Sequence, residues 1–390
     1  MSAYATCVER FIQSDIRNPL YDKPDMISFS AGRPDAAVFP LSDISTAFHV
    51  LFSKGELVQA LQYGTTEGLG PLREKLAAVV MKEAGVVTDT ENIMITTGSQ
   101  QGINFSAQLF VNPGDTVICE TPTYLGALNT FSVAGAQCIG IPVESDGMNI
   151  EALQQTLEKH RDAKFIYTIP DFQNPTGSYM SLKKRKQIAE LAAVYGVPVI
   201  EDAPYSEIRF TEEKLPPIKS FDTSGMVIYL STFSKTLCPG LRIGWICADT
   251  SILQKYVLLK GTSDSQSSTI DQFLAYYYLT NSDWKARVAS VRQVYLKRRN
   301  TMIEAIKKYL PDTISYVVPE GGFFVWLKLP ILMDDKELLN KTTAFWNVSF
   351  VPGSGFFPEK NKNNYIRLSY SNTPVDAIPE GIKRLGQALQ

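Results

Sequence analysis

The feature that most constrains the fold is a regular alternation, beginning near Asn92, between short apolar runs and longer amphipathic stretches. The short runs have the length and the branched residues of buried strands, and they occupy 93–95, 116–119, 138–141, 165–169 and 197–200. Residues 150–160 and 182–195 have the spacing of amphipathic helices. The alternation predicts an α/β fold with a mostly parallel sheet. Each strand is followed by a polar cluster, at the edge where such sheets bind ligands.

The pattern changes after about Ser282. A long charged helical stretch continues through Lys308, and strands are predicted at 322–329 and 365–370. We expect a smaller α+β domain here, which the N-terminal segment joins. A length of 390 residues suits two domains better than one. The predicted division is a large domain at 51–285 and a small domain made of 1–50 and 286–390.

Composition excludes several classes of partner. The chain is 44% apolar and 20% charged with a net charge of −2, so it offers no electrostatic case for binding nucleic acid or an anionic membrane. No secretory signal and no apolar stretch of transmembrane length is present. We therefore expect a globular protein that acts on small molecules.

Cysteine and histidine usage argues against a metal site. The five cysteines contain no CxxC pair, which favours reduced thiols in the cytoplasm. Only His49 and His160 are available as imidazoles, and both fall in helical stretches. With so few, neither a histidine metal site nor a Ser-His-Asp triad is expected.

Lys235 is the most distinctive candidate for chemistry. It follows the strand-like run 226–230 and lies among Thr232, Ser234 and Arg242. An amine surrounded by anion-binding groups suggests a Schiff base to a phosphorylated aldehyde cofactor, pyridoxal 5'-phosphate. A buried or salt-bridged structural lysine is the alternative when this motif is read alone.

Other strand ends supply what such a cofactor needs. Asp202 ends a strand and could hold a proton on the pyridine nitrogen, and Tyr205 could approach the ring from its oxygen side. Asn174 lies in an Asn-Pro turn, where its amide could donate to the ring oxygen or contact a substrate carboxylate. Taken alone, Asp202 is more simply explained as a helix cap or loop residue, and Asn174 as part of a turn.

Two further junctions complete the candidate set. Ser99 and Gln100 open an apolar helix directly after a strand and Gly98, so that backbone N–H groups and a hydroxyl face an anion. Tyr124 follows another strand and could stack on the ring, although core packing also explains an aromatic residue there.

Taken in order along nearly the whole chain, these segments resemble the fold-type-I, class I/II aminotransferases. The group formed by the 2-aminoadipate and the kynurenine or aromatic aminotransferases is the most similar. The resemblance also rests on these segments: 14–17, 26–29, 62–68, 202–205 and 366–369.

The resemblance implies a role for each candidate. Lys235 would carry the Schiff base and move the proton, Asp202 would pair with the ring nitrogen, Asn174 and Tyr205 with the ring oxygen, and Tyr124 would stack. The phosphate would be held by Ser99, Gln100, Thr232, Ser234 and Arg242.

The resemblance also implies how substrate and subunits are arranged. Arg367 would bind the substrate α-carboxylate as a two-pronged ion pair. Tyr63 would reach the phosphate of a neighbouring subunit, which implies a homodimer.

The chain departs from the family pattern near its N-terminus. Family members commonly read Ala-Gly-Gly-Leu-Pro where this chain has Ser-Ala-Gly-Arg-Pro at 30–34. Gly32 is expected to contact the substrate, and Arg33 adds a cation beside the expected substrate entrance. Arg17 and Arg33 are therefore the candidates for binding a distal carboxylate.

Three functions are compatible with this pattern. The leading one is amino transfer from an L-amino acid to a 2-oxo acid, with 2-oxoglutarate as the expected acceptor. A lyase, cyclase or decarboxylase that uses the same cofactor is the second. A regulator with an aminotransferase-like sensor domain is the third, and it is disfavoured because the first family-like motif starts near residue 14, leaving no room for a preceding DNA-binding domain.

Overall fold

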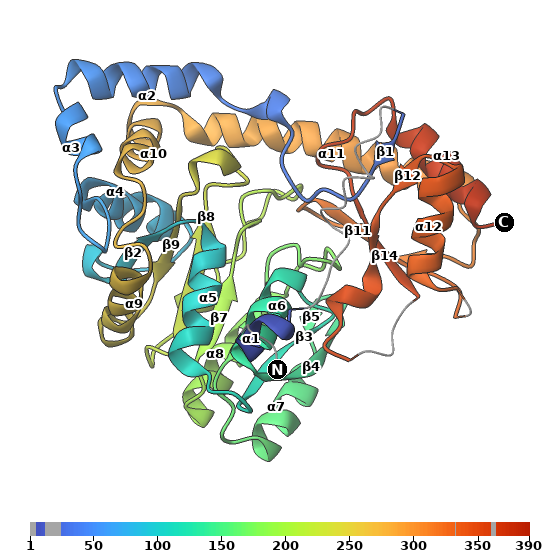
Figure 1. Ribbon diagram of the computed structural model, residues 1–390, viewed down its shortest axis with the longest axis horizontal. Coiled ribbons are helices and arrows are strands. Elements are labelled where there is room, and N and C mark those ends of the chain that lie inside the picture. The colour runs from blue at the N-terminus through green and yellow to red at the C-terminus, as the bar shows by residue number, and fades with distance from the viewer. Residues whose placement is uncertain (1–4, 12–24, 332, 360–363) are drawn as a thin grey trace.

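A sheet of eight strands forms the centre of the larger part of the molecule (Figure 1). The structure is a computed structural model that describes residues 5–11, 25–331, 333–359 and 364–390. The strands lie in the order β2 (Ile93–Thr96), β9 (Gly244–Cys247), β8 (Val227–Thr232), β7 (Val199–Asp202), β6 (Ile166–Thr168), β3 (Thr116–Thr121), β4 (Gln137–Glu144) and β5 (Gly147–Met148).

The sheet is mostly parallel, as predicted. Strands β8, β7, β6, β3 and β4 pair in parallel, whereas β9 is antiparallel to both of its neighbours and β5 is antiparallel to β4. The carboxyl ends of the parallel strands therefore meet at one edge. Polar side chains that follow different strands are brought together at that edge.

Helices cover both faces of this sheet. One face packs against α5 (Ser99–Phe110), α6 (Leu125–Ala134) and α9 (Thr250–Ser263). The other face packs against α7 (Ile150–Lys159), α8 (Leu182–Tyr195), α4 (Gly70–Lys75), η4 (Leu76–Met81) and α10 (Thr269–Asn281). Short helical turns connect these layers: η5 (Thr90–Asn92), η6 (Ile218–Phe221) and η7 (Pro239–Leu241).

Local capping signals determine several helix ends. Asn149 accepts a hydrogen bond from the backbone N–H of Ala152 at the start of α7, and Ser181 does the same for Lys184 in α8. At the end of α8, Gly196 adopts the left-handed conformation that commonly terminates a helix.

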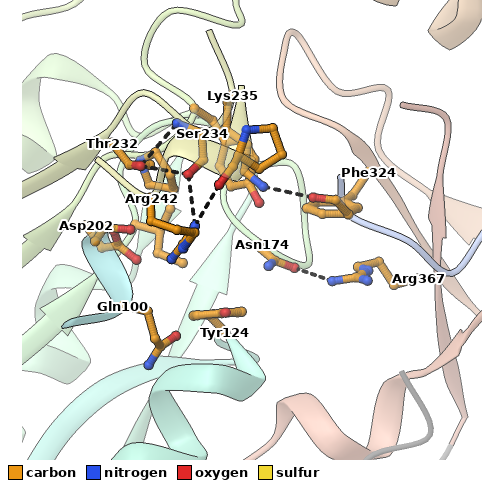
Figure 2. Close-up of a pocket in the computed structure, with 16 residues that line it drawn as sticks. Gln100, Tyr124, Asn174, Asp202, Thr232, Ser234, Lys235, Arg242, Phe324 and Arg367 are labelled. Carbon is orange, nitrogen blue, oxygen red and sulfur yellow. Dashed lines mark hydrogen bonds between the residues drawn. The ribbon is translucent and has the colours of Figure 1, made fainter. Parts of the chain in front are cut away.

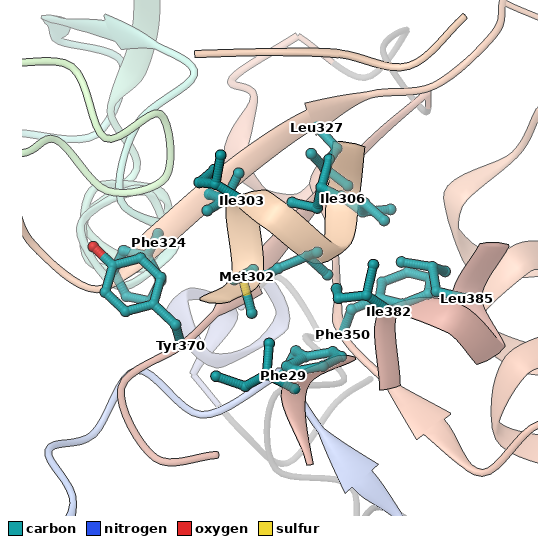
Figure 3. Close-up of a cluster of buried hydrophobic side chains, with 14 of the residues drawn as sticks. Phe29, Met302, Ile303, Ile306, Phe324, Leu327, Phe350, Tyr370, Ile382 and Leu385 are labelled. Carbon is teal, nitrogen blue, oxygen red and sulfur yellow. The ribbon is translucent and has the colours of Figure 1, made fainter. Parts of the chain in front are cut away.

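A smaller antiparallel sheet lies beside the first one (Figure 1). Its order is β10 (Ser315–Tyr316), β11 (Phe324–Lys328), β14 (Tyr365–Ser369) and β13 (Val351–Pro352). The short helix η8 (Gly353–Phe356) directly follows β13 in the chain. Helices α11 (Trp284–Tyr309), α12 (Asp335–Phe345) and α13 (Ile378–Ala388) pack against this sheet. Figure 3 shows the shared core, in which Met302 and Ile306 of α11 lie near Phe350 and Ile382. This is the α+β part that the sequence predicted.

The N-terminal segment contributes to both parts. Strand β1 (Ile27–Ser28) pairs in parallel with β12 (Val348–Ser349), and Phe29 packs in the smaller core. Helix α2 (Leu41–Ser53) instead packs on α10, followed by α3 (Leu57–Leu61). The remaining turns of this segment are α1 (Thr6–Glu9), which lies against α6, and η3 (Ala36–Val38).

The division into domains stays a prediction, and both expected boundaries fall inside helices. The boundary after residue 50 lies within α2, and the boundary after residue 285 lies within α11. Among the helices in the described ranges, none is both long and apolar enough to pass through a lipid bilayer.

Candidate active site

A cavity of about 290 Å³ lies between the carboxyl edge of the large sheet and strands β11 and β14 of the small one. Figure 2 shows side chains from both parts of the molecule pointing into it. Its wall contains these residues that the sequence singled out: Gly32, Ser99, Gln100, Tyr124, Asn174, Asp202, Tyr205, Thr232, Ser234, Lys235, Arg242 and Arg367. The structure thus brings together residues that are far apart in the sequence.

Lys235 is partly buried, and no carboxylate in the described ranges forms an ion pair with it. Its Nζ donates a hydrogen bond of 2.9 Å to the carbonyl of Gly32. The Nζ also lies 5.7 Å from the ring centre of Tyr205 and 5.6 Å from that of Phe323. Burial, together with repulsion from Arg367 and Arg242, lowers the pKa of Lys235 to about 8. A larger fraction of this amine is therefore neutral, and nucleophilic, near neutral pH than of an ordinary lysine.

Only one of the two carboxylate oxygens of Asp202 accepts a hydrogen bond from the described residues. The hydroxyl of Tyr167 donates to Oδ2 over 2.8 Å, whereas Oδ1 is buried and meets no hydrogen-bond partner in the described part of the chain. Burial raises the pKa of Asp202 to about 7, against the effect of the Tyr167 hydroxyl and of the charge on Lys235. A buried, unsatisfied carboxylate oxygen at a cavity wall calls for an N–H donor from a ligand.

The start of α5 and the loop after β8 form an anion cradle. The hydroxyls of Thr232 and Ser234 lie 2.9 Å apart, and Nη1 of Arg242 lies 3.4 Å from Oγ of Ser234. Gly98 precedes α5 with φ of +81°, and a Cβ there would lie 2.4 Å from Nη2 of Arg242. Only glycine lets the helix N-terminus approach this guanidinium so closely, and both groups favour an anion.

Arg367 is a buried cation whose partners in the described ranges are neutral. Its Nη1 donates to Oδ1 of Asn174 over 3.0 Å and its Nη2 to the carbonyl of Ser30 over 2.9 Å. The guanidinium lies over the ring of Phe324, at 4.1 Å from its centre. Burial lowers the pKa of Arg367 to about 10. A buried guanidinium with no carboxylate partner, at the wall of a cavity, is a binding site for a carboxylate ligand.

Two tyrosines, Tyr205 and Tyr124, line the cavity. Tyr205 is buried, packs edge-on against Phe323 and Phe324, and has its pKa raised by burial. Tyr124 comes from the β3–α6 connection and is visible below Asn174 in Figure 2.

Two predicted residues, Tyr63 and Arg33, do not line this cavity. Tyr63 is 84% exposed and lies at a separate surface cavity of about 360 Å³. Arg33 is exposed, next to Gly32 but outside the described cavity wall. Arg17 lies outside the described residues.

The structure adds residues that the sequence pattern did not single out. Phe324 also lines the cavity, and a Cβ on Gly32 would lie 2.8 Å from its ring, which explains the glycine. Tyr167 was predicted only as part of a strand, and no motif marked its contact with Asp202. The cavity wall also includes Ile169, Pro204 and Pro239.

These features fit pyridoxal phosphate. The unsatisfied Oδ1 of Asp202 suits a pyridine N–H, and the cradle at Gly98 and Arg242 suits a phosphate. The neutral fraction of Lys235 suits bond formation with an aldehyde. All three groups line one cavity.

Comparisons with known proteins agree with this geometry. The sequence model of the family "Aminotransferase class I and II" matches residues 24–385. Aromatic-amino-acid aminotransferase 1 of Thermococcus litoralis is 39% identical over 383 residues, which cover 97% of this chain and 91% of that protein.

Two solved structures have nearly the same fold. Kynurenine aminotransferase of Pyrococcus horikoshii, in complex with PMP, has a TM-score of 0.95 and 36% identity, covering 99% of this chain and 96% of its own. The α-aminoadipate aminotransferase of Thermus thermophilus, in complex with N-(5'-phosphopyridoxyl)-L-leucine, has a TM-score of 0.91 and 36% identity, covering 99% and 97%. The chain belongs to the class I and II aminotransferases and is a pyridoxal-phosphate-dependent transaminase of fold type I.

Proposed function

We propose that the cavity around Lys235 is the active site, and that it moves the amino group of an L-amino acid to a 2-oxo acid, with 2-oxoglutarate as the acceptor. The observation that carries this proposal is that two cationic side chains, Lys235 and the buried Arg367, line one cavity. Lys235 is a partly neutral amine, and Arg367 is a guanidinium without a carboxylate partner among the described residues. One can react with a carbonyl group while the other binds the carboxylate of the same substrate.

Most polar residues of the wall have a proposed role toward the cofactor. Pyridoxal phosphate supplies an aldehyde that amines attach to and a ring that withdraws electrons from the attached amino acid. Asp202 holds the proton on the ring nitrogen, Asn174 and Tyr205 donate to the ring oxygen, and Tyr124 lies against the ring face. The phosphate is held by Ser99, Gln100, Thr232, Ser234 and Arg242.

Lys235 has two proposed tasks. It holds the cofactor before the substrate arrives, and its freed Nζ then moves a proton from the α-carbon of the bound amino acid. The lowered pKa suits this second task, because a general base works best when its pKa lies near the working pH. The carbonyl of Gly32, which accepts from Nζ, orients the amine.

Arg367 and Asn174 fix the substrate. The planar guanidinium can pair with both oxygens of an α-carboxylate. This pairing holds the α-carbon within reach of Lys235, and orientation of this kind accounts for a large part of the rate enhancement in many enzymes.

Donor preference is proposed from the relatives and from the N-terminal segment. The names of the relatives include aromatic amino acids and 2-aminoadipate as substrates. We propose donors of these two kinds, with Arg17 and Arg33 as candidates for a distal carboxylate. If alanine at both positions leaves the preference for acidic over neutral donors unchanged, these arginines do not select the substrate.

We further propose a homodimer, with Tyr63 contributed to the neighbouring active site, and a cytoplasmic location. The first rests on the exposure of Tyr63 away from its own cavity. The second rests on the five cysteines, all of which are unpaired thiols.

A panel of amino donors tests the reaction. We expect the purified holoenzyme to be yellow, and we expect its visible absorbance to fall when a suitable L-amino acid is added and to return with 2-oxoglutarate. Arg367→Ala should raise KM for the donor by about 100-fold, because a charge-assisted bidentate contact is lost. Donor conversion to another product without any oxo acid would instead indicate a lyase, a cyclase or a decarboxylase.

A further inference from the structure

Glu120 is a buried carboxylate near the cavity that has no assigned role. It is the penultimate residue of β3, is 1% exposed, and does not belong to the described wall of the cavity. No cation in the described ranges neutralises it, and burial raises its pKa to about 7. Burying a carboxylate is costly, and this one does not line the cavity, so its presence here needs an explanation other than ligand contact.

Three donors converge on this carboxylate. The hydroxyl of Thr168 donates to Oε1 over 2.7 Å, and the backbone N–H of Ile169 donates to Oε2 over 3.1 Å. The side-chain amide of Gln173 also donates to Oε2, over 3.1 Å. A carboxylate accepts at both oxygens, whereas a glutamine is neutral and keeps these contacts only if its NH2 group faces the Thr168 hydroxyl and that hydroxyl accepts instead of donating.

Gln173 in turn holds the loop that follows β6. Its amide also donates to the carbonyl of Pro122 over 2.7 Å, and its Oε1 accepts from the N–H and the hydroxyl of Thr176 over 2.9 and 2.8 Å. All four hydrogen-bonding positions of this amide are therefore used together with the bond to Glu120. The next residue is Asn174, whose Oδ1 accepts from Arg367.

We infer that Glu120 is a positioning residue, which acts through Gln173 to place Asn174 and thereby the guanidinium of Arg367 for the substrate carboxylate. The inference rests on the proposed function of Arg367. If it holds, a residue at the end of β3 contributes to substrate binding without lining the cavity.

Glu201 provides a matched control. It also lies near the end of a strand, is 0% exposed, accepts two backbone N–H groups, from Ile218 and Lys219, and has its pKa raised by burial to about 7. Its partners belong to η6, which contributes no residue to the described cavity wall. Glu201→Gln therefore measures what loss of a buried carboxylate costs in general.

The first test measures binding and turnover separately. In the holoenzyme, Glu120→Gln should raise KM for the best donor about tenfold, because hydrogen bonds to a charged carboxylate are replaced by weaker ones to a neutral amide. The deaminated analogue of the donor, a carboxylic acid with hydrogen in place of the amino group, is the matching competitive inhibitor. Its inhibition constant should rise by the same factor. We expect kcat to change by less than about threefold, and Glu201→Gln to leave both binding constants unchanged.

A double-mutant cycle identifies the route. Asn174→Ala should weaken carboxylate binding by itself, and adding Glu120→Gln should then weaken it no further. Equal effects of Glu120→Gln with and without Asn174 would overturn the inference, as would unchanged constants in the single variant. If Glu120→Gln does not fold, Thr168→Val takes its place, because it removes one hydrogen-bond donor and keeps the carboxylate. We expect it to raise KM for the donor about threefold. An unchanged KM in this variant would also contradict the inference.

The unmodified enzyme separates this inference from the proposed function. Absence of transamination in the unmodified enzyme would refute the proposed function. Normal transamination there, with additive effects in the cycle, would refute only the role of Glu120.

Discussion

At the scale of single residues, the cavity holds two cations, Lys235 and Arg367, that form no ion pair with a carboxylate of the described residues. Lys235 is partly buried and Arg367 is buried, and burial lowers the pKa of each. Repulsion from Arg367 lowers the pKa of Lys235 further. Anions that enter the cavity relieve this repulsion, and a phosphate and a carboxylate are the two that the proposed reaction brings in.

The pKa of Lys235 predicts how the cofactor-free protein captures pyridoxal phosphate. Burial favours the neutral amine, so the capture rate should rise with pH with a midpoint near the pKa of about 8. An ordinary lysine would give a midpoint near its usual pKa of about 10.4. Arg367→Ala removes one repelling charge and should move the midpoint upward.

The measurement is the rate at which the visible absorbance appears after rapid mixing, between pH 6 and 10. A simple primary amine, mixed with the cofactor under the same conditions, corrects for the titration of the cofactor itself. A corrected midpoint near that of free lysine would show that burial does not activate Lys235.

At the scale of elements, the sequence predicts what local signals determine. The helix expected at 182–195 is α8 (Leu182–Tyr195), because Ser181 and Gly196 cap it within a few residues of its ends. Most site residues could also be predicted, since parallel strands place their carboxyl ends at one edge whatever their order in the sheet.

Contacts between distant segments could not be predicted in this way. Phe324 lines the cavity because β11 packs beside the large sheet, and α2 packs on α10 although its position in the chain suggested the smaller part. The hydrogen bond from Tyr167 to Asp202 joins neighbouring strands whose pairing the sequence does not specify. An amphipathic pattern shows that an element is buried on one face, but not against which partner.

The junction between β2 and α5 gives a prediction at this scale. Gly98→Ala should place a Cβ against Arg242 at a left-handed φ, which disturbs the anion cradle. We expect a loss of about 1–2 kcal/mol in the free energy of unfolding and an affinity for pyridoxal phosphate that is weaker by at least about tenfold.

Gly196→Ala is the matched control. Gly196 has a φ of +64°, and a Cβ at this position would have no neighbouring atom within 4 Å, so that the substitution introduces the backbone strain alone. Denaturant unfolding of the cofactor-free proteins and titration with the cofactor measure the two quantities. Equal cofactor affinities in the two variants would mean that the cradle does not depend on Gly98.

At the scale of the whole molecule, α2, α3 and the residues that follow them expose large apolar side chains. Leu41, Phe52, Val58, Leu61 and Tyr63 are all exposed there. An apolar surface of this kind commonly marks an interface between proteins, and a second copy of the chain related by a two-fold axis would cover it on both subunits. These exposed apolar side chains therefore support the proposed homodimer.

Mixing two defective variants tests whether Tyr63 serves the neighbouring site. Lys235→Ala and Tyr63→Ala should each give weakly active or inactive homodimers. In a mixed dimer, one site would carry both defects, and the other would combine the intact Lys235 of one chain with the intact Tyr63 of the other.

Unfolding and refolding the two variants together should therefore restore about a quarter of the unmodified activity per chain, since half of the dimers are mixed and each has one complete site. The assay should be run at limiting pyridoxal phosphate, where a lost phosphate contact is most evident. Refolding each variant alone gives the baseline. If Tyr63 acted within its own chain, every site in the mixed dimer would carry a defect, and the activity would stay at that baseline.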